Sequence, residues 1–136
     1  MMLVVDANMV IAALIKEGKA REILKSSKFK FVTSDFVKEE IQKYSEVIIE
    51  KSGLTKESLD LLEAIIFKEI ETIPKGSYEA KLHKAEEIMK NDVKDATYVA
   101  CYLALKCDGI WTHDPHFYGK PELKIFRTSN LLKLLQ

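Results

Sequence analysis

Short apolar runs alternate with longer segments of helical periodicity along the whole chain. Runs rich in β-branched and aromatic residues predict five strands, at residues 3–5, 29–33, 70–73, 110–112 and 124–126. Apolar residues spaced three or four apart predict helices at residues 10–14, 20–24, 36–48, 55–69, 77–89 and 93–106, and from 129 onward. Because strands alternate with helices, we expect an α/β fold: a three-layer α/β/α arrangement with a largely parallel central sheet.

Capping residues set some of the predicted helix boundaries. Ser34 is placed to cap the third predicted helix, Gly53 to end it, and Thr55 to cap the next one. Residues 52–71 are also compatible with a hairpin of helices inserted over one edge of the sheet.

Size and composition indicate one globular domain spanning residues 1–136. The chain is 47% hydrophobic, which suffices for a sizeable core. No apolar run approaches the roughly 20 residues of a membrane span, and no signal peptide is apparent. Cys101 and Cys107 lack a metal-binding spacing, so we expect Cys101 to be a small core residue in a reducing compartment. The predicted location is therefore cytoplasmic.

Charge is balanced, with 21 basic and 21 acidic residues and a formal net charge of zero. This balance argues against nucleic-acid binding through overall basic charge, yet it allows a local basic stripe beside an acidic pocket. Scattered basic residues usually belong to a solvated face. Those that could steer a phosphate backbone are Lys16, Arg21, Lys43, Lys94 and Lys120.

Acidic residues recur where predicted strands end. Asp6 ends the first strand, and Asp114 lies just beyond the fourth. Glu40 lies in the first turns of the helix that leaves the second strand, while Asp92 and Asp95 lie at the start of the helix that precedes the fourth. Since sites in α/β sheets form at the carboxyl ends of the strands, we expect these acids to converge.

Each acid also has a local interpretation. Asp92 and Asp95 suit capping and the dipole of a helix start, and Asp114 suits a turn. Glu40 taken alone is a solvated helix residue, although it lies closer than Glu39 to the apolar face. Taken together, carboxylates a few ångströms apart need raised pKa values or a cation among them. Oxygen ligands favour Mg²⁺ or Mn²⁺.

Two histidines flank Asp114 in the segment WTHDPHF. His113 and His116 have a spacing that can chelate a metal, but we favour contacts with phosphate or solvent for loop histidines in an oxygen-rich site. Trp111 and Phe117 are expected in the core rather than stacked on bases.

The chain resembles the PIN domain family in three segments, which follow one another in the order of that family's acidic motifs: LVVDANMVIAAL, TSDFVKEEIQKY and NDVKDATYVACYLALKCDGIWTHDPHF. The resemblance covers nearly the whole chain. It implies an α/β/α endoribonuclease that cleaves single-stranded RNA phosphodiesters with a water molecule activated by Mg²⁺ or Mn²⁺. Members of the family include toxins of the VapC type, which a small antitoxin protein neutralises, and RNA-processing nucleases.

Motif positions carry the family's site residues onto this sequence. The resemblance places the catalytic, metal-binding acids at Asp6, Glu40, Asp95 and Asp114, with Asp92 as a further metal ligand. Asn8 takes a position that is often Ser or Thr, and its amide can still hydrogen-bond a carboxylate or a water on the metal. Thr112 matches the usual Thr before the fourth acid.

Partners and rival functions follow from the same residues. We expect RNA, a small antitoxin in the toxin branch, and a homodimer to which a leucine-rich end contributes, unless that end packs inside: Leu131, Leu132, Leu134 and Leu135. A signalling receiver domain would need an Asp at the end of a central third strand, and a haloacid-dehalogenase phosphatase would need Asp in place of Asn8. The remaining alternative is a non-catalytic PIN module that binds RNA or proteins.

Overall fold

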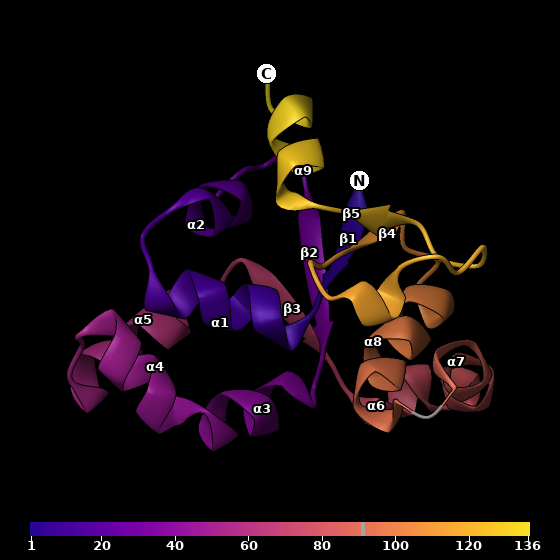
Figure 1. Ribbon diagram of the computed structural model, residues 1–136, viewed down its shortest axis with the longest axis horizontal. Helices are drawn as coiled ribbons and strands as arrows, with labels where there is room; N and C mark the ends of the chain where they lie inside the picture. The colour runs from indigo at the N-terminus through magenta and orange to yellow at the C-terminus, as the bar shows by residue number, and fades with distance from the viewer. Residues whose placement is uncertain (91) are drawn as a thin grey trace.

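A five-stranded parallel sheet forms the centre of the protein (Figure 1), whose computed structural model describes residues 1–90 and 92–136. The strands are β1 (Met2–Val5), β2 (Lys30–Ser34), β3 (Ile70–Ile73), β4 (Gly109–Trp111) and β5 (Ile125–Phe126). Their spatial order is β3-β2-β1-β4-β5, and every neighbouring pair is parallel. All five strands occur where the sequence predicts them, give or take a residue or two at their ends.

β1 is the central strand because its side chains are apolar on both faces. Leu3, Val4 and Val5 are fully buried. Val4 is paired with Val32 of β2 on one side and with Ile110 of β4 on the other. A continuous apolar run of this kind is typical of a parallel strand covered by helices on both faces. The residue that follows β1 is therefore held by the most constrained part of the sheet.

Helices cover both faces of the sheet. One layer, seen at the left of Figure 1, contains α1 (Ala7–Ile15), α2 (Lys19–Leu24), α3 (Val37–Lys43), α4 (Ser45–Ser52) and α5 (Lys56–Ile66). The opposite layer contains α6 (Lys75–Tyr78), a 3-10 turn η1 (Glu79–Lys81), α7 (Leu82–Met89) and α8 (Val93–Ala104). A second 3-10 turn, η2 (Pro115–Phe117), follows β4, and α9 (Thr128–Leu134) contacts α2 and β5. The three-layer α/β/α prediction is confirmed.

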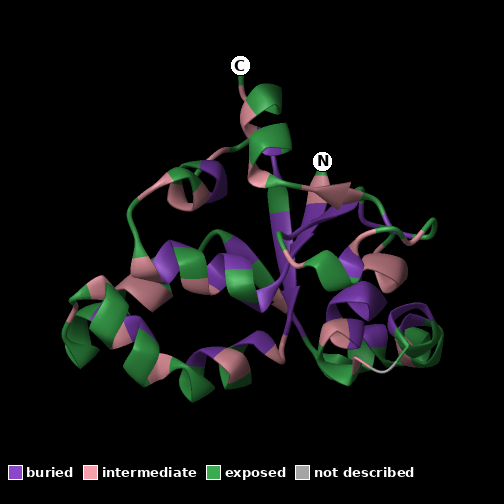
Figure 2. Ribbon diagram, in the orientation of Figure 1, coloured by how far each residue is buried: buried purple, intermediate pink, exposed green. Residues whose placement is uncertain are grey.

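The core lies between the sheet and the helix faces that turn toward it, as Figure 2 shows. α8 contacts β1, β2 and β4, and its small residues Ala96 and Ala100 are fully buried, which lets the helix approach the strands closely. Trp111 and Phe117 are fully buried, as predicted, and the Trp111 ring packs on Phe31 with 5.6 Å between centroids.

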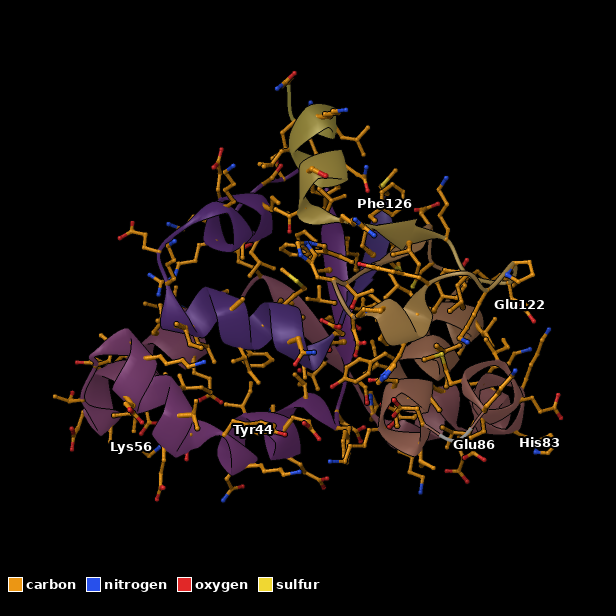
Figure 3. All side chains as sticks on the ribbon, viewed as in Figure 1. Tyr44, Lys56, His83, Glu86, Glu122 and Phe126 are labelled. Carbon is orange, nitrogen blue, oxygen red and sulfur yellow. The ribbon has the colours of Figure 1, made fainter. Side chains whose placement is uncertain are left out.

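The helix predicted at residues 36–48 is in fact two helices. α3 ends and α4 begins at Tyr44, whose backbone (φ −101°, ψ 14°) leaves the helical region. The Tyr44 side chain is 40% exposed at this bend (Figure 3), so it is not the core residue that the periodicity suggests. The apolar spacing continues across the bend without a change of period, which is why the sequence does not reveal it.

Capping agrees with the sequence at one predicted position and differs at another. Thr55 caps α5, where its hydroxyl accepts a hydrogen bond from the backbone nitrogen of Ser58 at 3.1 Å. Ser34 is the last residue of β2 instead of a helix cap. Its hydroxyl accepts a hydrogen bond from the Phe36 nitrogen at 3.1 Å, and α3 begins one residue later, at Val37.

The remaining segments refine the predicted pattern. Residues 52–71 contain a helix followed by a strand, and both α4 and α5 contact α1. The helix predicted at 77–89 is divided by η1.

Leu131 packs inside whereas Leu134 is 44% exposed, so the leucine-rich end is only partly core. Cys101 is fully buried, and burial raises its pKa to about 12. Within the described part of the chain, no helix has both the length and the apolar character needed to cross a membrane.

We expect Gly109→Ala to weaken the junction of β4 and β5. A Cβ atom at Gly109 would lie 2.4 Å from two ring carbons of Phe126 and 3.1 Å from the carbonyl oxygen of Lys124. Overpacking of this kind costs about 1–3 kcal/mol in the free energy of unfolding, to be measured by urea denaturation. Gly76→Ala in α6 is the matched control, because a Cβ there meets nothing within 4 Å. Equal destabilisation by the two substitutions would contradict the prediction.

Candidate metal centre

Asp6 is a carboxylate held in the protein interior where β1 becomes α1. It is only 3% exposed and serves as the N-cap of α1, where its Oδ1 accepts a hydrogen bond from the Met9 nitrogen at 2.9 Å. Its Oδ2 accepts a hydrogen bond from the hydroxyl of Thr112, just beyond β4. The Thr112 oxygen in turn accepts from the backbone nitrogen of Asp114 at 3.0 Å. One short network therefore fixes the first and fourth predicted acids relative to each other.

Asp92, Asp95 and Asp114 combine local roles with positions at the same site. Asp92 is the N-cap of α8, and its Oδ1 accepts a hydrogen bond from the Asp95 nitrogen at 3.3 Å. Asp114 caps η2 through a 2.9 Å hydrogen bond from the His116 nitrogen. The side chains of Asp95 and Asp114 are each only 17% exposed. The capping and turn interpretations are therefore correct, and they do not compete with a role at a shared site.

Glu40 enters the site from α3. Its side chain is 14% exposed and lies 3.6 Å from the Lys94 ammonium, measured from Oε1 to Nζ. Glu39 points elsewhere and lines a different surface hollow, beside Tyr78. The helical-face argument that favoured Glu40 over Glu39 agrees with this geometry.

A single cavity of about 190 Å³ joins these acids. The predicted acids in its wall are Asp6, Glu40, Asp92, Asp95 and Asp114. Four separate chain segments supply them, all near the edge of the sheet where the strands end. Asn8, in the first turn of α1, also lines this cavity, and its side chain is exposed. The structure thus brings together every acid that the sequence and the resemblance indicated.

His116 lies among the carboxylates, which the sequence interpretation did not favour. Its Nδ1 is 3.1 Å from Asp92 Oδ2, 3.6 Å from Asp95 Oδ2 and 3.5 Å from Asp114 Oδ1. Although burial alone would raise the pKa of Asp92, hydrogen bonds with Asp95 and the nearby His116 lower it below its usual value. The only signal in the sequence was the His-x-x-His spacing.

His113 points away from the acids, so the two histidines do not form a chelating pair. Its Nε2 accepts a hydrogen bond from the Thr128 backbone nitrogen at 3.1 Å and lies 2.8 Å from the Thr128 hydroxyl. The Trp111 indole nitrogen donates to the same hydroxyl at 3.1 Å. His113 thereby ties the loop before η2 to the start of α9.

Comparison with protein families matches residues 4–133 of the chain to the PIN domain model. The chain belongs to the PIN domain family. This membership confirms the resemblance of the three acidic segments, which all lie within the matched region apart from the first residue. No curated protein gives a match to the chain. PIN domains are generally nucleases and typically use divalent metals.

Burial makes it costly in free energy for the acids of the PIN cavity to carry their negative charges. Burial raises the pKa of Asp6 to about 6, against the opposing hydrogen bonds from Thr112 and Met9. Burial also raises the pKa of Asp95 to about 7, and the neighbouring Asp92 carboxylate adds to this shift. Carboxylates in this condition are stabilised in their charged form by a cation between them. Their oxygens are ligands that hard divalent cations prefer.

Tyr98 is a second cavity residue that the sequence pattern did not single out. It lies on α8 one turn after Asp95, is 2% exposed, and lines the same cavity. Its hydroxyl has no hydrogen-bond partner among the described residues. Burial and the surrounding carboxylates raise the pKa of Tyr98, so the hydroxyl stays neutral and able to donate. An unpaired buried donor costs about 1–3 kcal/mol, so it fits a cavity that receives a polar ligand.

We expect the raised pKa of Asp6 to make the metal-free protein less stable as pH rises. Well below its ordinary pKa of 3.8, Asp6 is protonated in both the folded and the unfolded chain, whereas above pH 6 the folded protein carries a buried charge. A shift of about two pKa units corresponds to about 3 kcal/mol. Asp6→Asn should therefore gain up to that much stability over wild type between pH 4.5 and 7.5, in urea denaturation with EDTA.

Asp60→Asn provides the matched control for this titration. Asp60 lies on α5 in an exposed pair with Lys56, 2.7 Å apart, and does not belong to the lining of the cavity. This variant should follow the pH dependence of wild type. If the difference between Asp6→Asn and wild type did not grow with pH, the buried charge would not be destabilising.

Proposed function

We propose that this PIN domain is a metal-dependent endoribonuclease that cleaves phosphodiester bonds of single-stranded RNA. The observation that carries the proposal is the convergence of five carboxylates, from four chain segments, on one cavity of about 190 Å³. If these acids served only in structural ion pairs, we would expect a comparable number of basic side chains among them. Here the acids outnumber the basic groups of the cavity wall, which are Lys94 and His116 among the described residues.

The acids would hold one or two Mg²⁺ or Mn²⁺ ions. Asp6, Asp95 and Asp114 are the proposed direct ligands, with Glu40 and Asp92 acting directly or through water. When bound, the cation activates a water molecule for attack on the phosphodiester and neutralises charge that develops on the phosphate. The chain's contribution is rigidity, because Asp6 is locked by Met9 and Thr112.

Neutral polar groups of the cavity are suited to a phosphate ester. We assign to the Tyr98 hydroxyl, which has no hydrogen-bond partner among the described residues, the role of a donor to a phosphate oxygen or an attacking water. The amide of Asn8, exposed at the rim, offers both a donor and an acceptor to the substrate.

Basic residues around the cavity divide into those available to RNA and those used by the fold. Lys94 lines the cavity and is 54% exposed, while Lys120 lines an adjoining hollow of about 540 Å³ that also borders Asp92 and His116. Arg21 is no longer a candidate for steering the phosphate backbone. Its Nε donates to the Ala13 carbonyl at 2.6 Å, which closes the end of α1.

Two branches of the proposal differ in their partners. A VapC-type toxin would bind a small antitoxin protein, whereas an RNA-processing nuclease would act without one. Both branches, the cytoplasmic location, the homodimer and the single-domain organisation over residues 1–136 stay predictions. The alternative function is a non-catalytic PIN module, and the presence of all five acids in the cavity disfavours it.

Cleavage of a fluorogenic single-stranded RNA tests the proposal. Asp6→Asn should reduce the rate at least about 100-fold, because it removes a charged ligand from the metal centre. EDTA should abolish cleavage by wild type, and added Mg²⁺ or Mn²⁺ should restore it. Asp60→Asn, an equal change of charge on α5, should cleave at the wild-type rate. Wild-type cleavage by folded Asp6→Asn would rule out this mechanism, and metal-independent RNA binding without cleavage would favour the non-catalytic module.

Tyr98→Phe should separate stability from activity. Removing the unpaired hydroxyl should stabilise the metal-free protein by about 1 kcal/mol in urea denaturation. The same change should slow RNA cleavage about tenfold, because a donor to the substrate worth about 1.4 kcal/mol is lost.

Tyr102→Phe is the matched control one turn further along α8. The Tyr102 hydroxyl already accepts a hydrogen bond from the Lys124 nitrogen at 3.3 Å. Its removal should leave the cleavage rate unchanged and should not stabilise the protein. Loss of stability in Tyr98→Phe would show that the hydroxyl has a partner inside the fold.

A further inference from the structure

His116 is presented to the acids by a well-anchored turn. Phe117, the next residue, is fully buried, and the backbone nitrogens of Phe117 and Tyr118 donate to the carbonyl oxygens of Asp114 and Pro115 at 3.1 and 3.0 Å. The His116 nitrogen itself donates to the Asp114 carboxylate. The backbone on both sides of the imidazole is thus fixed, although the ring is 68% exposed.

The imidazole and two carboxylates are close enough to share one ion. One ligand atom from each of Asp92, Asp95 and His116 lies within 4.8 Å of the other two. Ligands at about 2.0–2.3 Å from a common ion are separated by up to about 4.6 Å, so only a small closure is needed. These three residues are called the mixed triad below.

A second observation, independent of the triad, points to a ligand in the same cavity. The Tyr98 hydroxyl is buried in the cavity wall and has no partner among the described residues. A cluster of acids bound only to one another and to solvent does not explain a buried, neutral and unpaired donor in its wall.

We propose that His116 is a nitrogen ligand of the metal centre, and that the mixed triad therefore binds a first-row transition cation such as Mn²⁺ in preference to Mg²⁺. Mg²⁺ favours octahedral oxygen ligands, while imidazole favours transition metals over it. An all-carboxylate centre does not make this distinction. His116 thus turns a site for hard cations into one that discriminates between two ions of equal charge.

The simpler interpretation is an exposed ion pair between the His116 imidazolium and Asp92. Exposed pairs contribute little, and nothing in a pair accounts for approach of the same nitrogen to carboxylates from three residues. The two interpretations differ in measurable terms, because an ion pair competes with a metal whereas a ligand retains it. Removing His116 would strengthen Mn²⁺ binding in the first case and weaken it in the second.

The experiment measures metal binding by the full chain without RNA. The inference rests on the proposed metal centre but not on nuclease activity, so the two can fail separately. Protein stripped with EDTA is titrated with Mn²⁺ and with Mg²⁺ by calorimetry, and the Mn²⁺ complex is examined by pulsed electron paramagnetic resonance. Wild type should bind Mn²⁺ at least about tenfold more tightly than Mg²⁺, with a ¹⁴N coupling from a directly bound imidazole.

Substitutions at His116 test the assignment. His116→Ala should lose the ¹⁴N coupling and about tenfold in Mn²⁺ affinity, with little change for Mg²⁺. His116→Asp, which replaces nitrogen with oxygen, should bind both ions with nearly equal affinity. His83→Ala is the matched control, since His83 on α7 also pairs with a carboxylate, Glu87 at 2.9 Å, but lies away from the cavity (Figure 3).

Specific results would overturn the inference. These are a ¹⁴N coupling that survives in His116→Ala, an unchanged ratio of Mn²⁺ to Mg²⁺ affinity in that variant, or tighter Mn²⁺ binding by it. Mn²⁺ binding with the expected coupling, in a protein that cleaves no RNA, would support the inference and count against the nuclease function.

Discussion

The burial of one carboxylate organises the functional end of this protein. Asp6 follows the central strand β1, whose last three side chains are fully buried, so its charge is withdrawn from solvent by the same packing that stabilises the sheet. Two donors, the Met9 nitrogen and the Thr112 hydroxyl, compensate it only in part, and its pKa remains raised to about 6. The rest of the site supplies four further carboxylates and, among the described residues, only two basic groups, Lys94 and His116, so the acids of the cavity remain in excess.

α8 connects the packed core to the cavity, because it packs on the sheet and also positions three of the cavity's side chains. Asp92, Asp95 and Tyr98 follow one another at intervals of three residues at its beginning, and so they share one face of the helix. Further along, Ala100 is fully buried where the helix contacts the sheet. The spacing of these three side chains is therefore determined by helix geometry and by packing, both of which resist distortion better than a loop would.

The sequence predicts the parts of the site that depend on sheet topology. Strand order in a parallel sheet places Asp6, Glu40 and Asp114 at one edge whatever the details of the loops, so their convergence follows from the alternation of strands and helices. The same reasoning cannot orient a loop side chain. His113 and His116 are equivalent by spacing, and only the turn η2, anchored by buried Phe117, sends one of them toward the acids.

Two further features could not be predicted from the sequence, because the same apolar periodicity is compatible with different structures. Tyr98 fits the apolar periodicity of α8 as well as a leucine would, so its hydroxyl becomes significant only when its burial beside the acids is seen. Tyr44 continues the periodicity of α3 although the backbone bends there. In both cases the helical periodicity indicates the face on which a side chain lies. It does not indicate which groups the side chain contacts or whether the helix is straight.

Hydrogen bonds to Thr128 connect the cavity to the C-terminal helix α9. Trp111 and His113, on either side of Thr112, both contact the Thr128 hydroxyl at the first residue of α9. Thr112 is the residue whose hydroxyl orders Asp6 and Asp114. A force that displaces α9 therefore acts, within three residues, on the network that spaces the two acids. The C-terminal helix is thus joined to the site by a short chain of hydrogen bonds through Thr128.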